Sequence, residues 1–386
     1  MLFLGLKMVR NRLYKASFET LRNLIAYSLF TKAESQCSCP KHQVKVYPVV
    51  QSPVATNQSK GKIVPPKSTN SLMKHLRDQG VSIGGSAQKR KLKNIGYYHG
   101  YKGFRFVGDS SKRLPITDFS QIASLHAMDM QFKTLLYPHI MTIETALKNY
   151  TLEAVLRRAQ SEDFDEIFKT CLTAYRGYQP GTDKYKKSWA NRLRLRQTID
   201  GLISREQDKR PFFKHFRDQG RTIPIWAIFE AMTLGEFGNF YACLDRPVKK
   251  AIVIDLGMPS QFDSESLLLS IIFSLKDLRN AIAHNAIVSD VRFKSGGISN
   301  RIGKLLKSET DIDSVNFADI TDYIVLIVYF LSLLKLSKTD RRRLISDFEA
   351  ILIKYKKELP VGIYGRLFRT ETSKKLKTLR KYVTKS

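Results

Sequence analysis

The stretch HAMDMQFKTLLYPHIMTIETALKN, residues 126–149, repeats apolar side chains at the spacing of one face of an α-helix. The apolar positions of this stripe are Leu125, Met128, Phe132, Leu135, Leu136, Ile140, Ile143 and Leu147. Asp129 and Glu144 are acids beside the stripe, and Pro138 is expected to kink or break the helix. The stretch therefore predicts a long helix that faces a core.

Helical spacing continues on both sides of this stretch. Further helices are predicted within residues 65–83, 184–210, 264–284, 316–336 and 340–357. Residues 223–244 predict two short helices, the first beginning at Pro224, with a break at Gly235 or Gly238. Strand signals are few, so the predicted class is an all-α helical bundle, with room for one small hairpin over residues 97–106.

Composition divides the chain into three parts. Residues 1–63 predict an N-terminal extension, with an amphipathic helix over residues 13–30 and a linker without periodicity over residues 34–62. Residues 64–360 predict the helical body, and residues 361–386 a basic C-terminal tail.

The net charge is the clearest bulk signal. Lysine and arginine number 65 against 35 acidic residues, which gives +30 at pH 7. A surface this basic repels itself unless an anion covers it, and nucleic acid is the commonest such partner. The charge therefore predicts a partner such as RNA and excludes a merely well-solvated protein.

An acidic membrane is the rival partner, and the sequence argues against it. The longest apolar run, residues 323–336, is shorter than the roughly 20 residues that a spanning helix needs. MLFLGL at the N-terminus is too short for the core of a signal peptide. The four cysteines suggest no disulfide framework, so a cytoplasmic location is expected.

Two segments predict contacts to RNA. NIGYYHGYKGFRF, residues 94–106, interleaves aromatic rings that can stack on bases with cations that can hold phosphates. A packing role for its tyrosines is equally open. Residues 184–210 are dense in lysine and arginine, although such runs are usually only solvated. The candidate RNA-binding residues are Tyr97, Tyr98, His99, Tyr101, Lys102, Arg105, Arg192, Arg194 and Arg196.

The motif that points to chemistry is LRNAIAHN, residues 278–285. His284 has the residue type to move a proton at neutral pH, and Arg279 can neutralise a phosphate as charge develops on it. With the RNA's own 2′-hydroxyl as nucleophile, the pair would cleave RNA without a metal and leave a 2′,3′-cyclic phosphate. Asn280 directly follows the arginine and is a candidate polar helper.

The spacing of this pair implies a partner subunit. Positions five apart lie about 140° apart around a helix, so one copy of Arg279 and His284 makes a poor site. Two copies meeting at a two-fold axis would pool both pairs, which predicts a homodimer. The structural alternatives are a histidine that caps the helix C-terminus and an arginine paired with Asp277 or another acid. Arg210 and His215 repeat the spacing, but Pro211 follows that arginine.

Metal and cofactor motifs are weak. Cys37, Cys39 and His42 lie close together, but a zinc site needs a fourth ligand and usually a second cysteine–histidine pair. The sequence also carries no phosphate-binding glycine loop of the Walker type, no HExxH and no GxSxG. Neither a metal nor a cofactor is therefore expected.

Several spaced segments together resemble the Abi-like (AbiF/AbiD-type) abortive-infection family of phage-defence proteins. The resemblance covers roughly residues 65–336. It rests on the segments that begin PPKSTNSLMKHL, NIGYYHG, HAMDMQF and PIWAIFEAM, and on LRNAIAHN, which is similar to the family's HEPN ribonuclease signature. His99 departs from the family's Tyr-Tyr-Arg pattern, and residues 1–63 lie outside the match.

The resemblance implies a HEPN-type helical bundle over roughly residues 120–340, with Arg279 and His284 as the ribonuclease pair and Asn280 beside them. It also implies an endoribonuclease toxin, restrained in some members by a structured non-coding RNA. A non-catalytic RNA-binding scaffold of a ribonucleoprotein is the alternative. A HEPN protein silenced by nucleotidyl transfer from a partner is less favoured.

Overall fold

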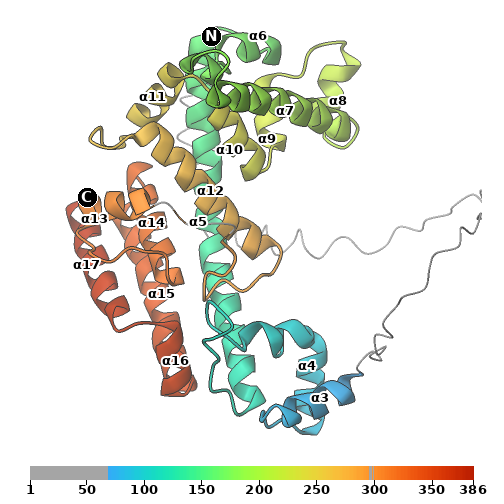
Figure 1. Ribbon diagram of the computed structural model, residues 1–386, viewed down its shortest axis with the longest axis vertical. Helices are drawn as coiled ribbons and strands as arrows, with labels where there is room; N and C mark the ends of the chain where they lie inside the picture. Colours follow the sequence, from blue (N-terminus) through green and yellow to red (C-terminus); the bar gives the residue numbers. More distant parts are fainter. Residues whose placement is uncertain (1–67, 295–297, 299) are drawn as a thin grey trace, which may run out of the picture. The chain divides into compact units, whose positions relative to one another are not determined.

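Helix α5 (Phe119–Ala159) is the element around which the other helices are arranged. In this computed structural model, residues 68–294, 298 and 300–386 are described, and all of them belong to one unit, Pro65–Ser386. Helices from before and after α5 in the sequence contact it, among them α4, α11, α12 and α15 (Figure 1). The extension predicted over residues 1–63, with Cys37, Cys39 and His42, lies outside the described residues.

The long helix predicted around residues 126–149 is confirmed and extends further in both directions. Asp118 caps its first turn in a capping box with Gln121, and Gln160 ends it in the left-handed conformation at φ 52°. All but one of the stripe's positions are buried, Leu135 being half-buried. Pro138 lies inside α5 and does not end it. Burial on both sides of the proline stabilises the helix against the loss of one hydrogen bond.

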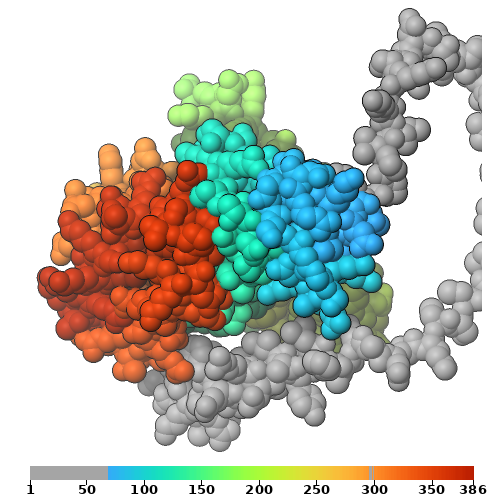
Figure 2. Space-filling view, turned by 90° about the horizontal axis from the view of Figure 1, so that it is seen from below, coloured from blue at the N-terminus to red at the C-terminus, as the bar shows by residue number. Residues whose placement is uncertain are grey.

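The N-terminal helices pack against one end of α5 (Figure 2). Ser68 caps α3 (Thr69–Asp78), the helix predicted within residues 65–83, and Gly80 follows its end at φ 80°. Helix α4 (Gly85–His99) and the 3-10 helix η1 (Lys102–Phe104) follow. The hairpin expected over residues 97–106 is therefore wrong. Tyr101 and Phe104 turn into the core, and an isolated bridge joins Phe106 to Arg113.

The middle of the chain forms shorter helices around one long basic helix. These are α6 (Phe164–Thr170), η2 (Ala174–Gly177), α7 (Asp183–Glu206), α8 (Pro211–Asp218), α9 (Ile225–Ala231), α10 (Leu234–Cys243) and α11 (Arg246–Asp255). The two short helices predicted within residues 223–244 are α9 and α10. They separate at Met232 and Thr233, where Thr233 makes a capping box with Glu236, and not at either glycine.

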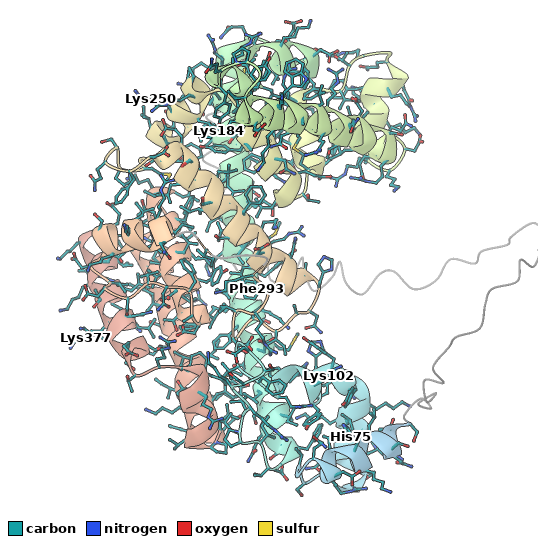
Figure 3. All side chains as sticks on the ribbon, viewed as in Figure 1. His75, Lys102, Lys184, Lys250, Phe293 and Lys377 are labelled. Atoms are coloured by element: carbon teal, nitrogen blue, oxygen red, sulfur yellow. The ribbon has the colours of Figure 1, made fainter. Side chains whose placement is uncertain are left out.

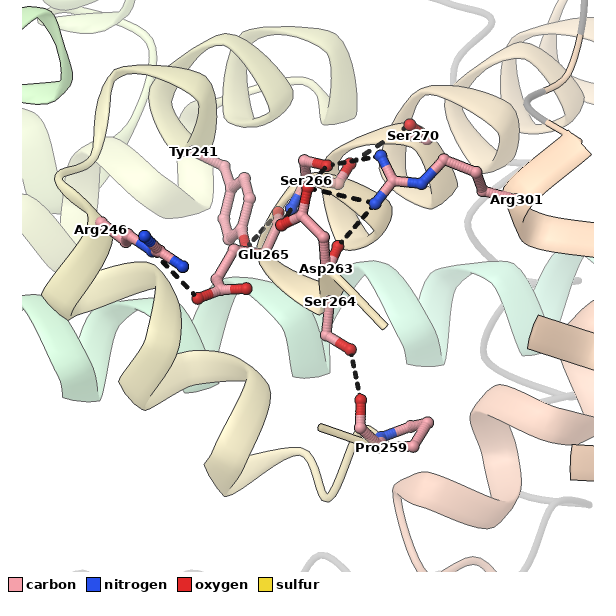
Figure 4. A network of polar contacts seen from close by, with 9 residues as sticks. All are labelled: Tyr241, Arg246, Pro259, Asp263, Ser264, Glu265, Ser266, Ser270 and Arg301. Atoms are coloured by element: carbon pink, nitrogen blue, oxygen red, sulfur yellow. Dashed lines mark hydrogen bonds and ion pairs between the residues drawn. The ribbon is translucent and has the colours of Figure 1, made fainter. Parts of the chain in front are cut away.

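Helix α10 packs closely on α12 (Ser264–Ala283), the helix that carries the candidate catalytic motif. Gly238 suits this packing, because a Cβ at that position would lie 3.1 Å from the ring of Phe273, closer than an ordinary contact. A polar network fixes the start of α12 (Figure 4). Asp263 accepts a hydrogen bond from the Ser266 hydroxyl at 2.6 Å and pairs with Arg301 at 3.1 Å.

The C-terminal helices complete the core. They are α13 (Asn300–Thr310), α14 (Ile320–Leu333), α15 (Lys338–Glu358), α16 (Val361–Leu367) and α17 (Glu371–Lys385). Helix α14, which contains most of the apolar run over residues 323–336, is buried almost throughout. Among the described residues, no helix has the length and apolar character needed to cross a membrane.

The segment predicted as a basic tail, residues 361–386, forms α16 and α17. Leu376, Leu379 and Val383 of α17 are buried, and Lys375 makes an ion pair of 2.5 Å with the buried Asp322 of α14. Truncation here would open the core, so it is unsuitable as a test of RNA contacts.

Candidate functional site

The predicted catalytic residues lie at the C-terminal end of α12. His284 is the residue that caps the helix, and its backbone N–H donates to the Asn280 carbonyl at 2.9 Å. Its imidazole is exposed. Arg279 is half-buried one turn earlier, and its Nη1 donates to Oδ1 of Asn280 at 3.4 Å. The backbone of His284 therefore does the capping, and its side chain faces solvent.

A buried ion pair on α5 holds the chain that follows His284. Lys133 Nζ lies 2.8 Å from Oδ2 of Asp129, and both side chains are almost inaccessible. Oδ1 of Asp129 accepts the backbone N–H groups of Val288 and Ser289 at 2.8 and 2.9 Å. Lys133 also donates to Oδ1 of Asn285 at 2.7 Å. We call Asp129 and Lys133 the clamp, because they tie residues 285–289 to α5.

The clamp acts on a strained piece of backbone. Asn285 has a φ of 54°, in the left-handed region that asparagine tolerates better than most residues. The hydrogen bond from Lys133 reaches this same side chain. The turn that carries His284 away from α12 is thus fixed from two directions, by its own conformation and by α5.

A second acid–lysine pair on α5 contacts Arg279. Glu144 is 4% exposed, and its Oε1 accepts a hydrogen bond from Lys148 at 3.0 Å. Its Oε2 lies 3.7 Å from Nε of Arg279, an ion pair in which neither atom makes a hydrogen bond within the described residues. Lys148 also donates to the Met232 carbonyl at 2.6 Å. Glu144 is therefore an acid that pairs with Arg279, and Asp277 makes an ion pair with Lys276.

A cavity of about 280 Å³ opens beside this second pair. Helices α5, α9 and α12 contribute to its wall, together with Met232 and Thr233 between α9 and α10, and with Arg210, the arginine that repeats the motif's spacing. Its lining residues are Met141, Glu144, Thr145, Lys148, Arg210, Glu230, Ala231, Met232, Thr233 and Arg279. Three cations and two carboxylates thus share one small cavity.

Two histidines lie close to the clamp. The rings of His99 and His126 are 5.7 Å apart between centroids, in an edge-on arrangement. Burial lowers the pKa of both imidazoles. For His99 the positive charge of Lys133 adds to that effect, and for His126 the charges of His99 and Lys133 do so, while Asp129 opposes it in both. Both rings are therefore mainly neutral at pH 7.

The predicted RNA-binding residues near α4 have different surroundings. Tyr101 is 1% exposed and belongs to the core, and Tyr97 is half-buried against it. Tyr98 is 52% exposed, and Lys102 is exposed at the start of η1 (Figure 3). The guanidinium of Arg105 stacks 4.7 Å from the ring centre of Phe106. Packing thus accounts for Tyr101, whereas Tyr98 and Lys102 are the exposed members of this predicted set.

The three predicted arginines of α7 also differ. Arg192 is buried, donates to the carbonyls of Leu172 and Phe168 at 2.8 Å each, and lies 3.6 Å from the ring centre of Phe168. Arg196 pairs with Asp165 at 2.6 Å. Arg194 is exposed. This geometry indicates a structural role for Arg192 and leaves Arg194 as the exposed arginine of the three.

Lys133 and Lys148 were missed by the sequence analysis, and Asp129 and Glu144 were named only as acids beside the stripe. A signal for all four was present. Each acid has a lysine four residues later on the same face of α5, and Asp129, Lys133 and Glu144 fall among the buried positions. A charged residue in a buried register needs a partner, so a lysine four residues after each acid is the sequence signal for these two pairs. The described residues contain no group of three or more metal-ligating side chains.

Comparison with known proteins identifies the family of the chain. A family model described as Abi-like protein matches residues 90–290, which include α5, the clamp, Glu144 and the motif on α12. The chain belongs to this Abi-like family. Membership indicates abortive infection, and so phage defence, as its general role. No curated protein and no solved structure matches the chain.

Proposed function

We propose that this Abi-like protein is a metal-independent endoribonuclease of abortive infection, with Arg279 and His284 as its catalytic pair. The main support is the placement of the pair. The exposed His284 and the half-buried Arg279 lie at one end of α12. Two buried charged residues of α5 contact this end: Lys133 bonds to Asn285, next to His284, and Glu144 pairs with Arg279. The net charge of +30 suits an RNA substrate and a bound structured RNA.

In the proposed reaction, the 2′-hydroxyl of RNA attacks the adjacent phosphorus. His284, at the exposed tip of α12, takes the proton from that hydroxyl. Arg279 neutralises the charge that builds on the phosphate oxygens, since a guanidinium stays protonated throughout. The 5′-oxygen leaves with a proton, and the products are a 2′,3′-cyclic phosphate and a 5′-hydroxyl. A second His284, from the partner of a homodimer, would supply the leaving-group proton.

The clamp gives this mechanism its positional precision. A histidine after the last helical turn would otherwise move with the loop that follows it. Asp129 and Lys133 hold that loop at three points, so the backbone of His284 keeps one position relative to Arg279.

The test compares wild-type protein with His284→Ala and Arg279→Ala after bound nucleic acid is removed. Labelled RNA is added in EDTA, and the product ends are mapped. We expect cleavage by wild type, with cyclic phosphate ends, and a loss of at least a hundredfold in either variant. His215→Ala is the matched control, because His215 is an exposed histidine with the same spacing to an arginine. Equal cleavage by wild type and His284→Ala would refute the assignment.

A non-catalytic RNA-binding scaffold is the second proposal. It is favoured by the ion pair between Arg279 and Glu144, which gives the arginine a structural partner. In that case neither the wild-type protein nor His284→Ala cleaves RNA, and both bind RNA tightly. The His284→Ala substitution then alters only the affinity for RNA.

A further inference from the structure

We propose that the cavity beside Arg279 is a subsite for a guanine nucleotide of the RNA. This inference rests on the proposed function, because it supplies a base preference to the same site. In it, the guanine edge donates to Glu144, and Arg279 and Lys148 meet the phosphates on either side.

The first argument is an acceptor without a donor. Oε2 of Glu144 is inaccessible to solvent, yet no hydrogen bond reaches it from the described residues, and Arg279 Nε stays 3.7 Å away. Leaving a buried charged oxygen without a hydrogen bond costs about 1–3 kcal/mol or more, so a ligand donor that reached this oxygen would be stabilised there. Glu144 lines the cavity, so a donor within it would reach this oxygen once the guanidinium of Arg279, 3.7 Å away, turns from the carboxylate toward a phosphate.

The second argument is the mixture of charges. Arg279, Lys148 and Arg210 attract an anion, whereas Glu144 and Glu230 would repel a bare phosphate or sulfate. The ligand must therefore combine negative charge with a separate edge of N–H donors. A nucleotide has this combination, and splayed bases of single-stranded RNA are read through their Watson–Crick edges.

The third argument selects the base. Guanine presents two neighbouring donors, N1–H and the 2-amino group, and a carboxylate can accept both because it has about four lone-pair positions. Adenine, cytosine and uracil each offer one such donor group at that edge. The second oxygen of Glu144 already accepts from Lys148, which fixes the orientation of the carboxylate.

The dimensions and the remaining lining suit one base. The cavity of about 280 Å³ lies just under the roughly 300 Å³ at which clefts for larger ligands begin. Met141, Ala231 and Met232 supply apolar contact, and methionine sulfur packs well against aromatic rings. A single flipped base would thus find both a polar edge and an apolar face.

The experiment measures binding and not cleavage, so that it stands apart from the proposed nuclease. Full-length His284→Ala protein is titrated with 5′-GMP, 5′-IMP and 5′-AMP, and with oligonucleotides in which one guanine is replaced by inosine, which lacks the 2-amino group. We expect guanine to bind roughly ten- to a hundredfold more tightly than inosine in the oligonucleotide series. Glu144→Gln in the same background should abolish the difference, because the amide replaces one acceptor by a donor.

Glu153→Gln is the control, since Glu153 is an exposed acid on the same helix. If Glu144→Gln does not fold, the inosine comparison still decides, because it changes only the ligand. Equal binding of guanine, inosine and adenine ligands would overturn the proposal. A preference seen with free GMP but not within RNA would also overturn it and would assign the cavity to a free nucleotide. If the protein prefers guanine but wild type does not cleave RNA, the proposed nuclease activity is refuted and the proposed guanine subsite is retained.

Discussion

Two acid–lysine pairs on α5 have the same local geometry and opposite surroundings. Asp129 and Lys133 lie 2.8 Å apart, and Glu144 and Lys148 lie 3.0 Å apart, each four residues along one helix. In the first pair both carboxylate oxygens and the ammonium have partners within the fold. In the second pair one carboxylate oxygen has no hydrogen bond and the side chains line a cavity. The first pair is thus satisfied within the fold, whereas the second leaves the acceptor that we propose a ligand uses.

The largest effect should come from breaking the first pair. Asp129→Ala leaves the ammonium of Lys133 buried without its counter-ion and leaves two backbone N–H groups unpaired. We expect the free energy of unfolding to fall by about 3–5 kcal/mol, measured by urea denaturation. Glu153→Ala, at an exposed position of the same helix, serves as the control. A loss below about 1 kcal/mol would show that the clamp is not structural.

The second pair should respond in the opposite sense. Glu144→Gln keeps the volume, and Lys148 retains the Met232 carbonyl as an acceptor. We expect the free energy of unfolding to change by about 1 kcal/mol or less, while RNA binding or cleavage changes at least tenfold. Thermal denaturation and RNA titration on one preparation provide the two readings. A large loss in the free energy of unfolding, with RNA binding and cleavage unchanged, would show that the second pair is structural like the first.

Substitutions at Asn285 separate two contributions to stability: the hydrogen bond from Lys133 to its side chain, and the left-handed conformation of its backbone. Asn285→Gly removes the acceptor of Lys133 but suits a φ of 54°, whereas Asn285→Ala loses both advantages. We expect alanine to be less stable than glycine by about 1 kcal/mol, since the left-handed conformation disfavours a Cβ. Denaturant midpoints of the two variants test this. Equal midpoints would mean that the conformation of Asn285 carries no cost.

The smallest effect should be a pH dependence near the clamp. The pKa values of His99 and His126 are lowered in the folded protein below the unfolded value of about 6.5. Below that pH the unfolded chain binds more protons, so the free energy of unfolding decreases as pH falls from 7 through the folded pKa values. The charged groups that face the pair are Lys91, Asp129 and Lys133. His126→Gln should flatten the slope between pH 7 and 5, as followed by urea denaturation; an unchanged slope would contradict this origin.

Local patterns predicted the helices well because burial of an apolar stripe dominates their formation. The stripe of α5 and the end of α12 at His284 both follow from residue spacing. The resemblance to the Abi-like family, built on five such segments, is confirmed over residues 90–290. The hairpin failed because alternating glycines and aromatics fit a 3-10 turn as well as strands, and core packing of Tyr101 and Phe104 decided between them.

Contacts between distant segments could not be predicted from one sequence. Glu144 and Arg279 are 135 positions apart, and the bond from Lys133 to Asn285 spans 152. Likewise, the sequence treated Gly235 and Gly238 as breaks, although α10 keeps both. The modest helix penalty of a glycine is offset where its missing side chain lets another helix approach. The catalytic pair therefore stays a prediction from sequence, whereas its surroundings come from the fold.

The unbroken course of α5 limits which length changes this family member can accept. Asp129 and Glu144 are separated by 15 residues, or roughly 22 Å along the axis. One inserted residue between Lys133 and Glu144 would turn one pair about 100° away from α12 while the other stayed in place. Seven inserted residues would restore the direction but shift the pair by roughly 10 Å. Insertions and deletions in this stretch should thus be rejected, even at positions where every single substitution is harmless.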